Sequence, residues 1–290
     1  MIIFARCAAL PFLLVLAVLS GCAGTRNEPA ADRPTAGRPA SPEPPPTAAA
    51  GPPALPLDAR GRIPVFSHGS RDPGDDVKRV ALTFDADMTR DQGPRAAAGE
   101  RFDNPELIEL LRQEKVASTI FMTGMWARTY PDQAATIGRD PLFEVANHTF
   151  SHYAYTAGCY GLPRLTPGEF RSDAERAATE ILAAGVPQMA PYFRFPGGCY
   201  DDAALHALAP TGVTAVQWDV SGGDAFATDP GGIADHVLDE VRPGSVVVLH
   251  CTRSAAPATA EAMRRIIPGL RARGYEFVRV SDLIAADRPH

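Results

Sequence analysis

Two histidines stand four residues apart in the segment His148-Thr-Phe-Ser-His152. If the chain turns into a helix there, both imidazoles lie on one face and can bind one divalent metal. Asp85 and Asp87 follow the β-rich run Val80–Phe84, and a regular strand would point both carboxylates to the same side. One carboxylate would complete a metal site open to water, and the other would take a proton from that water. The alternative is a pair of structural histidines and a solvated acidic loop.

Other ionisable residues follow β-rich runs in the same way. His250 comes directly after three valines and a leucine, Arg194 lies within the run Pro191–Phe195, and Asp219 and Asp224 follow another run. The carboxyl ends of successive parallel strands meet at one end of a barrel, which is where barrel enzymes build their active sites. The pattern therefore favours one shared site.

The elements that must position these residues alternate along the chain. Short β-rich runs are predicted at Val80–Phe84, Ala117–Thr123, Leu142–Ala146, Pro191–Phe195, Val213–Trp218, Ser245–Leu249 and Glu276–Val280. Helix signals lie between them, with caps at Asn104, Thr166 and Asp229. About seven alternations predict a parallel α/β sheet, either a barrel or a doubly wound sheet. A doubly wound sheet would gather functional groups at one switch point, so their spread over several strand ends favours the barrel.

Residues 1–21 have the parts of an export signal. Arg6 supplies the positive charge, and the apolar run Ala8–Leu19 is shorter than the roughly 20 residues of a membrane span. The run ends in Leu19-Ser-Gly-Cys22, which resembles the lipobox of bacterial lipoproteins. That resemblance implies lipidation of Cys22 and an extracytoplasmic protein anchored to the bacterial cell membrane. An ordinary signal peptide or an uncleaved anchor is the alternative.

Composition divides the rest of the chain into a linker and a domain. Of the 28 prolines, 11 lie between Pro29 and Pro64, where large apolar residues are few. We expect residues 22–65 to be a disordered Pro/Ala-rich linker, because such a segment buries too little surface to offset its ordering entropy. Residues 66–290 are long enough for one domain with a substantial core. A net charge of −6 argues against nucleic-acid binding.

Five segments in order resemble the motifs of the polysaccharide deacetylases, also known as the NodB-homology domain or carbohydrate esterase family four. The segments are Val80–Asp87, His148–His152, Arg194–Gly198, Asp219–Asp224 and Leu249–His250. The resemblance covers about residues 78–284 and implies a distorted (β/α) barrel of about seven parallel strands, in agreement with the alternation.

The resemblance also implies roles for the first two motifs. In the family the first motif reads Thr-Phe-Asp-Asp, with a general base followed by a metal ligand. Asp85 takes the place of the base, but Ala86 follows it, so the ligand is expected at Asp87 or is lost. His148 and His152 carry over as ligands of a divalent metal, expected to be Zn²⁺.

The remaining motifs imply an acid and a substrate groove. Arg194 would orient the base, and Gly197 replaces an aromatic, which predicts a more open groove wall beside Gly198. Asp224 is a further catalytic candidate in the fourth motif, where Ala225 replaces a tryptophan. Three more residues complete the set: Trp218 fills similar space, Leu249 lines the acetyl pocket and His250 is the general acid.

Three cysteines remain in the domain, at positions 159, 199 and 251. A disulfide is allowed outside the cytoplasm, and Cys159 and Cys199 each follow a motif segment and precede a tyrosine. We therefore hypothesise a Cys159–Cys199 bridge near the site and expect Cys251 to be a small buried side chain.

The sequence thus predicts a monomeric, metal-dependent hydrolase that removes N-acetyl groups from an N-acetylated envelope or extracellular polysaccharide, such as peptidoglycan or a chitin-like polymer. Its expected partners are that glycan and, through the lipid, the membrane. Two alternatives remain. One is a glycan-binding module that has lost catalysis, which is supported by Ala86 in place of the second aspartate of the first motif. The other is a metal-dependent amidase acting on a small non-sugar amide.

Overall fold

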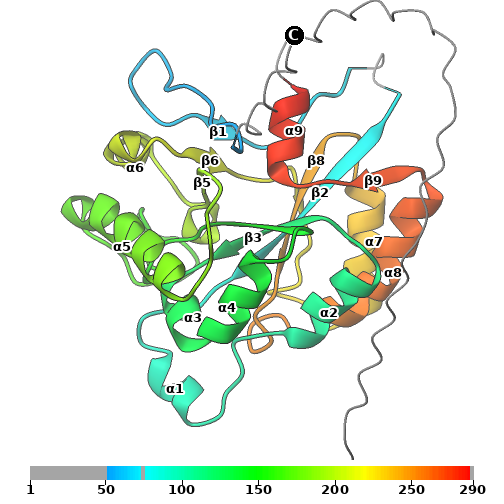
Figure 1. Ribbon diagram of the computed structural model, residues 1–290, viewed down its shortest axis with the longest axis horizontal. Helices are drawn as coiled ribbons and strands as arrows, with labels where there is room; N and C mark the ends of the chain where they lie inside the picture. Colours follow the sequence, from blue (N-terminus) through cyan, green and yellow to red (C-terminus); the bar gives the residue numbers. More distant parts are fainter. Residues whose placement is uncertain (1–50, 73–75, 288–290) are drawn as a thin grey trace, which may run out of the picture. The chain divides into compact units, whose positions relative to one another are not determined.

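The computed structural model describes residues 51–72 and 76–287, and they fold around one curled parallel sheet (Figure 1). The strands follow the order β1-β6-β5-β4-β3-β2-β8-β7, and β9 pairs with the beginning of β2. Their bounds are β1 Val65–Phe66, β2 Lys78–Ala86, β3 Ser118–Met122, β4 Phe143–Asn147, β5 Tyr192–Phe193, β6 Thr214–Val216, β7 Val220–Ser221, β8 Ser245–His250 and β9 Tyr275–Phe277. The expected distorted (β/α) barrel is confirmed. Every predicted β-rich run overlaps a strand, and the two-residue strands β1 and β7 add to them.

Helices cover the outside of the sheet (Figure 1). Their bounds are α1 Gly93–Ala97, α2 Pro105–Gln113, α3 Gly124–Thr129, α4 Pro131–Gly138, α5 Phe170–Ala183, α6 Asp202–Ala207, α7 Pro230–Glu240, α8 Thr259–Ala272 and α9 Val280–Ala286. The predicted caps are present: the Asn104 and Asp229 side chains accept from backbone N–H groups of the first turns of α2 and α7, and Thr166 forms a capping box before α5. Along the chain these helices alternate with the strands, as a parallel sheet requires.

The inside of the barrel is filled by side chains that alternate with those facing the helices. This inner core contains Phe66, Ala81, Phe121, Ala146, Tyr192, Val216 and Val246, together with Val280, Leu283 and Ile284 of α9. Helix α9 thereby closes one end of the barrel. Side chains of β3 and β4 bind the first N–H groups of this helix: Val280 N donates to Thr119 Oγ1 (2.9 Å), and Ser281 N donates to Glu144 Oε1 (3.1 Å).

The same alternation decides which residues reach the open end of the barrel. Residues an even number of positions after an inner-core residue on the same run face inward. Those at or just past the carboxyl ends of the strands are Asp85, His148, Arg194, Trp218 and His250. The register brings them together: Asp85 lies opposite His250 across β2 and β8, and Asn147, next to His148, lies opposite Phe193, next to Arg194.

The folded part of the chain begins earlier than predicted. Within the expected linker, Ile63 is buried, Leu55 N donates to Thr214 Oγ1 (2.9 Å), and Pro53 O accepts from Tyr192 Oη (3.0 Å). The linker boundary at residue 65 is therefore wrong, because two apolar side chains and a few backbone hydrogen bonds suffice to attach this segment along the sheet edge. The proposed signal at 1–21, Cys22 and the linker up to residue 50 lie outside the described residues.

Over the described ranges, no helix combines the length and apolar character needed to cross a bilayer.

Candidate active site

A tight loop after β4 brings the two histidines together. Thr149 and His152 both have a positive φ, of 70° and 53°, so the segment is not the helix that the four-residue spacing allowed. The His148 and His152 rings nevertheless meet edge to face with centroids 4.9 Å apart. Two residues outside the predicted set hold the loop: Asn147 Oδ1 accepts from Thr149 N (2.8 Å), and the buried Asp173 Oδ2 accepts from Phe150 N (2.9 Å).

Asp85 is a buried carboxylate paired with a buried guanidinium. Arg194 Nη1 donates to Asp85 Oδ1 (2.7 Å), while the other carboxylate oxygen lies 3.5 Å from His148 Nε2. Arg194 is itself fixed by the Val216 carbonyl, which accepts from Nε (3.2 Å), and by the Phe121 ring, which lies 3.9 Å from Cζ. Burial raises the pKa of Asp85, but Arg194 and the nearby histidines more than offset it, so the pKa lies below its ordinary value. Asp85 is therefore ionised at neutral pH.

Asp87 lies beside His152, with Oδ2 3.7 Å from Nε2. Thr252, just past the end of β8, holds it: the Thr252 hydroxyl accepts from Asp87 N (3.1 Å) and hydrogen-bonds the Oδ1 atom of the same residue. Asp85 and Asp87 thus line one pocket, as the alternation predicted. Thr252 was not predicted from the sequence, because it belongs to no motif and only its position two residues after His250 could have pointed to it.

The donor groups at this end of the barrel fit a divalent metal. His148 Nδ1 is hydrogen-bonded to the Arg194 carbonyl (2.9 Å), so the other ring nitrogen, Nε2, is the one that faces Asp85, as in histidines that bind a metal through Nε2. Burial lowers the pKa of His148 and lowers that of His152 to about 4, so both imidazoles are neutral, as ligands must be. Two imidazoles and the Asp87 carboxylate are a common zinc donor set. Among the described residues, no group of three or more His, Cys, Asp or Glu side chains lies close enough together to hold a metal ion without some rearrangement.

His250 faces the same pocket and is held by Asp224. The buried Asp224 accepts from His250 Nδ1 (2.9 Å) and from His250 N (2.8 Å), and its Oδ2 also accepts from Thr259 Oγ1 (2.6 Å). Burial disfavours the imidazolium, but the Asp224 charge and hydrogen bond prevail, with smaller contributions from Asp87 and Asp85, and raise the pKa of His250 to about 10. The imidazole therefore carries a proton at neutral pH. Asp224 acts through His250 and does not line the pocket.

The pocket between these groups has a volume of about 310 Å³. It is lined by Asp85, Asp87, His152, Tyr160, Leu162, Gly197, Trp218, Ser221, Ala225, Phe226, Val248 and His250. Leu249, predicted to line the acetyl pocket, instead packs in the core under the helices. Strand alternation explains the error: Val248, two residues before His250, shares its face, whereas Leu249 points to the other side.

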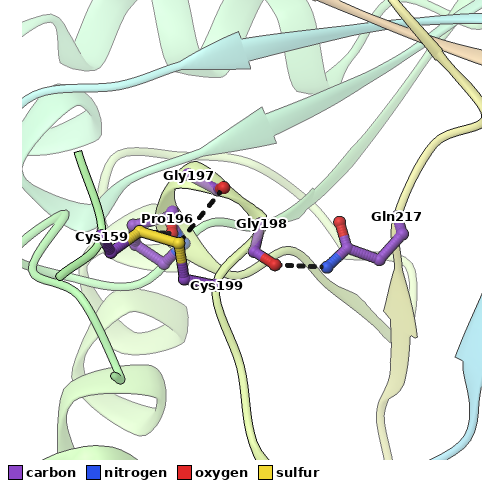
Figure 2. The surroundings of a disulfide bond; sticks show 6 residues. All are labelled: Cys159, Pro196, Gly197, Gly198, Cys199 and Gln217. Atoms are coloured by element: carbon purple, nitrogen blue, oxygen red, sulfur yellow. Dashed lines mark hydrogen bonds between the residues drawn. A yellow bond between two sulfur atoms is a disulfide. The ribbon is translucent and has the colours of Figure 1, made fainter. Parts of the chain in front are cut away.

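The wall beside Gly197 is closed, contrary to the prediction of an open groove. The hypothesised Cys159–Cys199 disulfide is present (Figure 2). A Cβ on Gly197 would lie 2.7 Å from Cys159 Sγ and 2.9 Å from Tyr160 Cδ2, so the disulfide and Tyr160 occupy the space of the missing side chain. Cys251 is a buried free cysteine, as expected.

Trp218 reaches the pocket because its neighbour is a glycine. A Cβ on Gly198 would lie 2.6 Å from the Trp218 ring. The Gly198 carbonyl accepts from Gln217 Nε2 (2.8 Å; Figure 2), which holds this turn against β6. Gly198 therefore shapes the pocket without lining it.

Comparison with known proteins shows which family the chain belongs to. The family model described as polysaccharide deacetylase matches residues 72–216, half of the chain. The chain belongs to the polysaccharide deacetylase family. A chitooligosaccharide deacetylase from Bradyrhizobium is 30% identical over 74% of this chain and 95% of its own length. A peptidoglycan-N-acetylglucosamine deacetylase from Bacillus cereus is 29% identical over 71% and 88%.

A solved structure shares the fold. It is a pseudoenzyme of carbohydrate esterase family four from Bacillus anthracis, with a TM-score of 0.61 and 22% identity over 76% of this chain and 68% of its own. The predictions that the chain is a member of this family and a deacetylase are confirmed.

Proposed function

We propose that this deacetylase is a metal-dependent hydrolase that removes the N-acetyl group from N-acetylglucosamine units of a glycan. The observation that carries the proposal is that a carboxylate and an imidazole with opposite charges face the same pocket. On one side, Asp85 is kept ionised by Arg194, and on the other, His250 is kept protonated by Asp224. A base and an acid with pKa values pushed apart are what amide hydrolysis needs.

Each group has a task in the reaction. Water attacks the acetyl carbonyl, and Asp85 takes the proton that the water loses. The amide C–N bond then breaks, and His250 gives its proton to the departing amine, which is a poor leaving group without it. A divalent ion, which we propose to be Zn²⁺ held by His148, His152 and Asp87, would polarise the carbonyl and lower the pKa of water. The products are acetate and a free amino sugar.

The names of the relatives support the substrate class. They are a chitooligosaccharide deacetylase and a peptidoglycan-N-acetylglucosamine deacetylase, which share N-acetylglucosamine as the acetylated sugar. We further propose that the protein is anchored through lipidated Cys22 at the bacterial cell membrane, facing envelope glycans. The lipobox-like sequence before Cys22 supports this location.

The test combines metal content with acetate release. The purified protein is given Zn²⁺, and acetate is measured with an N-acetylglucosamine tetramer, with peptidoglycan and with simple acetamides. We expect about one metal per chain and acetate from a glycan. His152→Ala should lose metal and activity, whereas His206→Ala, an exposed histidine on α6, should keep both.

Two results would overturn the proposal. Ala86 stands where the first motif of the family has its second aspartate, which favours a glycan-binding module as the second candidate. A protein that binds glycan but holds no metal and releases no acetate would establish that alternative. Acetate released only from small acetamides would instead identify an amidase for non-sugar substrates.

A further inference from the structure

Two aromatic side chains stand exposed at the mouth of the active-site pocket. Tyr160 is 70% exposed and Phe226 79% exposed, and their ring centroids lie 5.7 Å apart. Both line the pocket that contains Asp85 and His250. Single exposed apolar side chains are common on protein surfaces, but a pair gathered over a polar pocket marks a surface that a ligand covers.

The Tyr160 ring is held in position by a closed loop. Ala154 N donates to Pro163 O (2.7 Å) and Leu165 N donates to Ala154 O (3.0 Å), which joins the two ends of the loop. Inside it, Leu162 N donates to Cys159 O (2.9 Å), and Tyr160 itself adopts a positive φ of 48°. The loop thus keeps Tyr160 in a left-handed conformation that is uncommon for a non-glycine residue, with one side of the ring near Gly197 and most of the side chain exposed beside the pocket.

The disulfide ties this loop to the strand end that carries Arg194. Cys199 lies five residues after Arg194, and its bond to Cys159 is shown in Figure 2. Tyr160, the residue after Cys159, has its ring against Gly197, because a Cβ built there would lie 2.9 Å from Tyr160 Cδ2. The segment that carries Tyr160 is therefore covalently linked to the segment that carries Arg194, whose guanidinium holds the base.

Phe226 is held by the turn that also holds the acid. Phe226 N donates to Gly223 O (3.0 Å), and Gly223 has a φ of 68° that suits glycine. Asp224, the partner of His250, belongs to the same turn. The backbone of each residue of the pair thus belongs to a segment that also supports one catalytic group.

We propose that Tyr160 and Phe226 form a stacking platform for a pyranose ring of the glycan next to the unit that loses its acetyl group. This inference rests on the proposed function, since it takes the substrate to be a glycan. A pyranose carries C–H groups on its faces and hydroxyls at its edges, so an aromatic ring covers a face while the hydroxyls stay in water. The two residues determine specificity for chain length and take no part in bond cleavage.

The test compares an N-acetylglucosamine tetramer with the methyl glycoside of the single sugar. Only the tetramer can occupy the pocket and the platform together. For Tyr160→Ala and Phe226→Ala we expect the Kd and KM of the tetramer to rise about tenfold and those of the single sugar to rise by a much smaller factor. Tyr160→Phe keeps the ring and should behave as the unchanged protein.

A matched control and a disulfide variant complete the test. Tyr200→Ala removes another exposed aromatic beside the same disulfide, one that stacks on Phe195 and does not line the pocket, so tetramer binding should not change. The double variant Cys159→Ala, Cys199→Ala should raise the tetramer KM about threefold or more while turnover of the single sugar, which reports folding, is retained.

The outcomes separate the platform from the proposed function. Equal losses on tetramer and single sugar, or no loss on either, would overturn the platform, as would failure of the unchanged protein to bind the tetramer. An unchanged tetramer KM in the double cysteine variant would overturn the role of the disulfide. If the unchanged protein binds the tetramer without releasing acetate, and Tyr160→Ala weakens that binding, the platform stands and the deacetylase proposal fails.

Discussion

Replacing Asp224 with asparagine removes the charge that keeps His250 protonated. Asp224 Oδ1 lies 2.9 Å from His250 Nδ1, and an opposite charge at such a distance raises a pKa by about 1–3 units. We therefore expect Asp224→Asn to lower the pKa of His250 from about 10 to about 7–9. Because His250 must carry a proton to act as an acid, activity is lost as the pH rises through this pKa. A downward shift of two units would cut the protonated fraction at pH 9 about tenfold.

The assay is the pH dependence of kcat/KM for acetate release from the tetramer, which reports groups of the free enzyme. In the unchanged protein the high-pH limb should lie near pH 10, and in Asp224→Asn it should move down by at least about one unit. Thr259→Val is the matched control, because it removes a hydrogen bond to Asp224 without removing the charge, so the limb should stay in place. A high-pH limb that does not move in Asp224→Asn would refute the assignment of His250 as the acid.

Three further predictions test the rest of the site. Asp85→Asn should abolish turnover but leave bound metal, measured by elemental analysis, unchanged, because it removes the base and no ligand. Asp87→Ala should weaken metal affinity at least about tenfold in titration calorimetry. Thr252→Val removes the hydroxyl that holds the Asp87 carboxylate and should weaken the affinity less. Equal metal affinity in these two variants and in the unchanged protein would exclude Asp87 as a ligand. Gly197→Ala should lower the free energy of unfolding by about 2–4 kcal/mol in urea, because a Cβ would overlap the disulfide, whereas Gly212→Ala, at a similar φ in open space, should cost only about 1–2 kcal/mol. Equal losses at both glycines would show that crowding at the disulfide is unimportant.

Much of the site could be predicted because strand periodicity is a local property. Asp85, Arg194 and His250 all lie at or near strand ends, and parallel pairing brings those ends to one edge. The same rule, applied strictly, would have selected Val248 in place of Leu249, since only residues two apart share a face.

What the sequence did not reveal depends on contacts between distant segments. Tyr160 fills the space over Gly197 because a loop some 40 residues earlier in the chain crosses the strand end, and no local pattern announces such a crossing. Asp173 and Thr252 support the site from an adjoining helix and loop, and either would pass for an ordinary surface residue in the sequence. The early start of the folded part was missed because so few apolar residues attach it.

The pairing of β2 with β8 joins residues far apart in the chain, and for that reason enzymatic activity can serve as a measure of complete folding. Asp87 and Thr252 are separated by 165 positions, and the Thr83 hydroxyl donates to the Val247 carbonyl across 164. The base lies on one of these strands and the acid on the other, so neither segment makes half a working site. A fragment that ends before β8 should be inert however well its remaining helices form. Turnover is therefore a stringent report on complete folding, and its loss during denaturation should coincide with unfolding of the whole barrel.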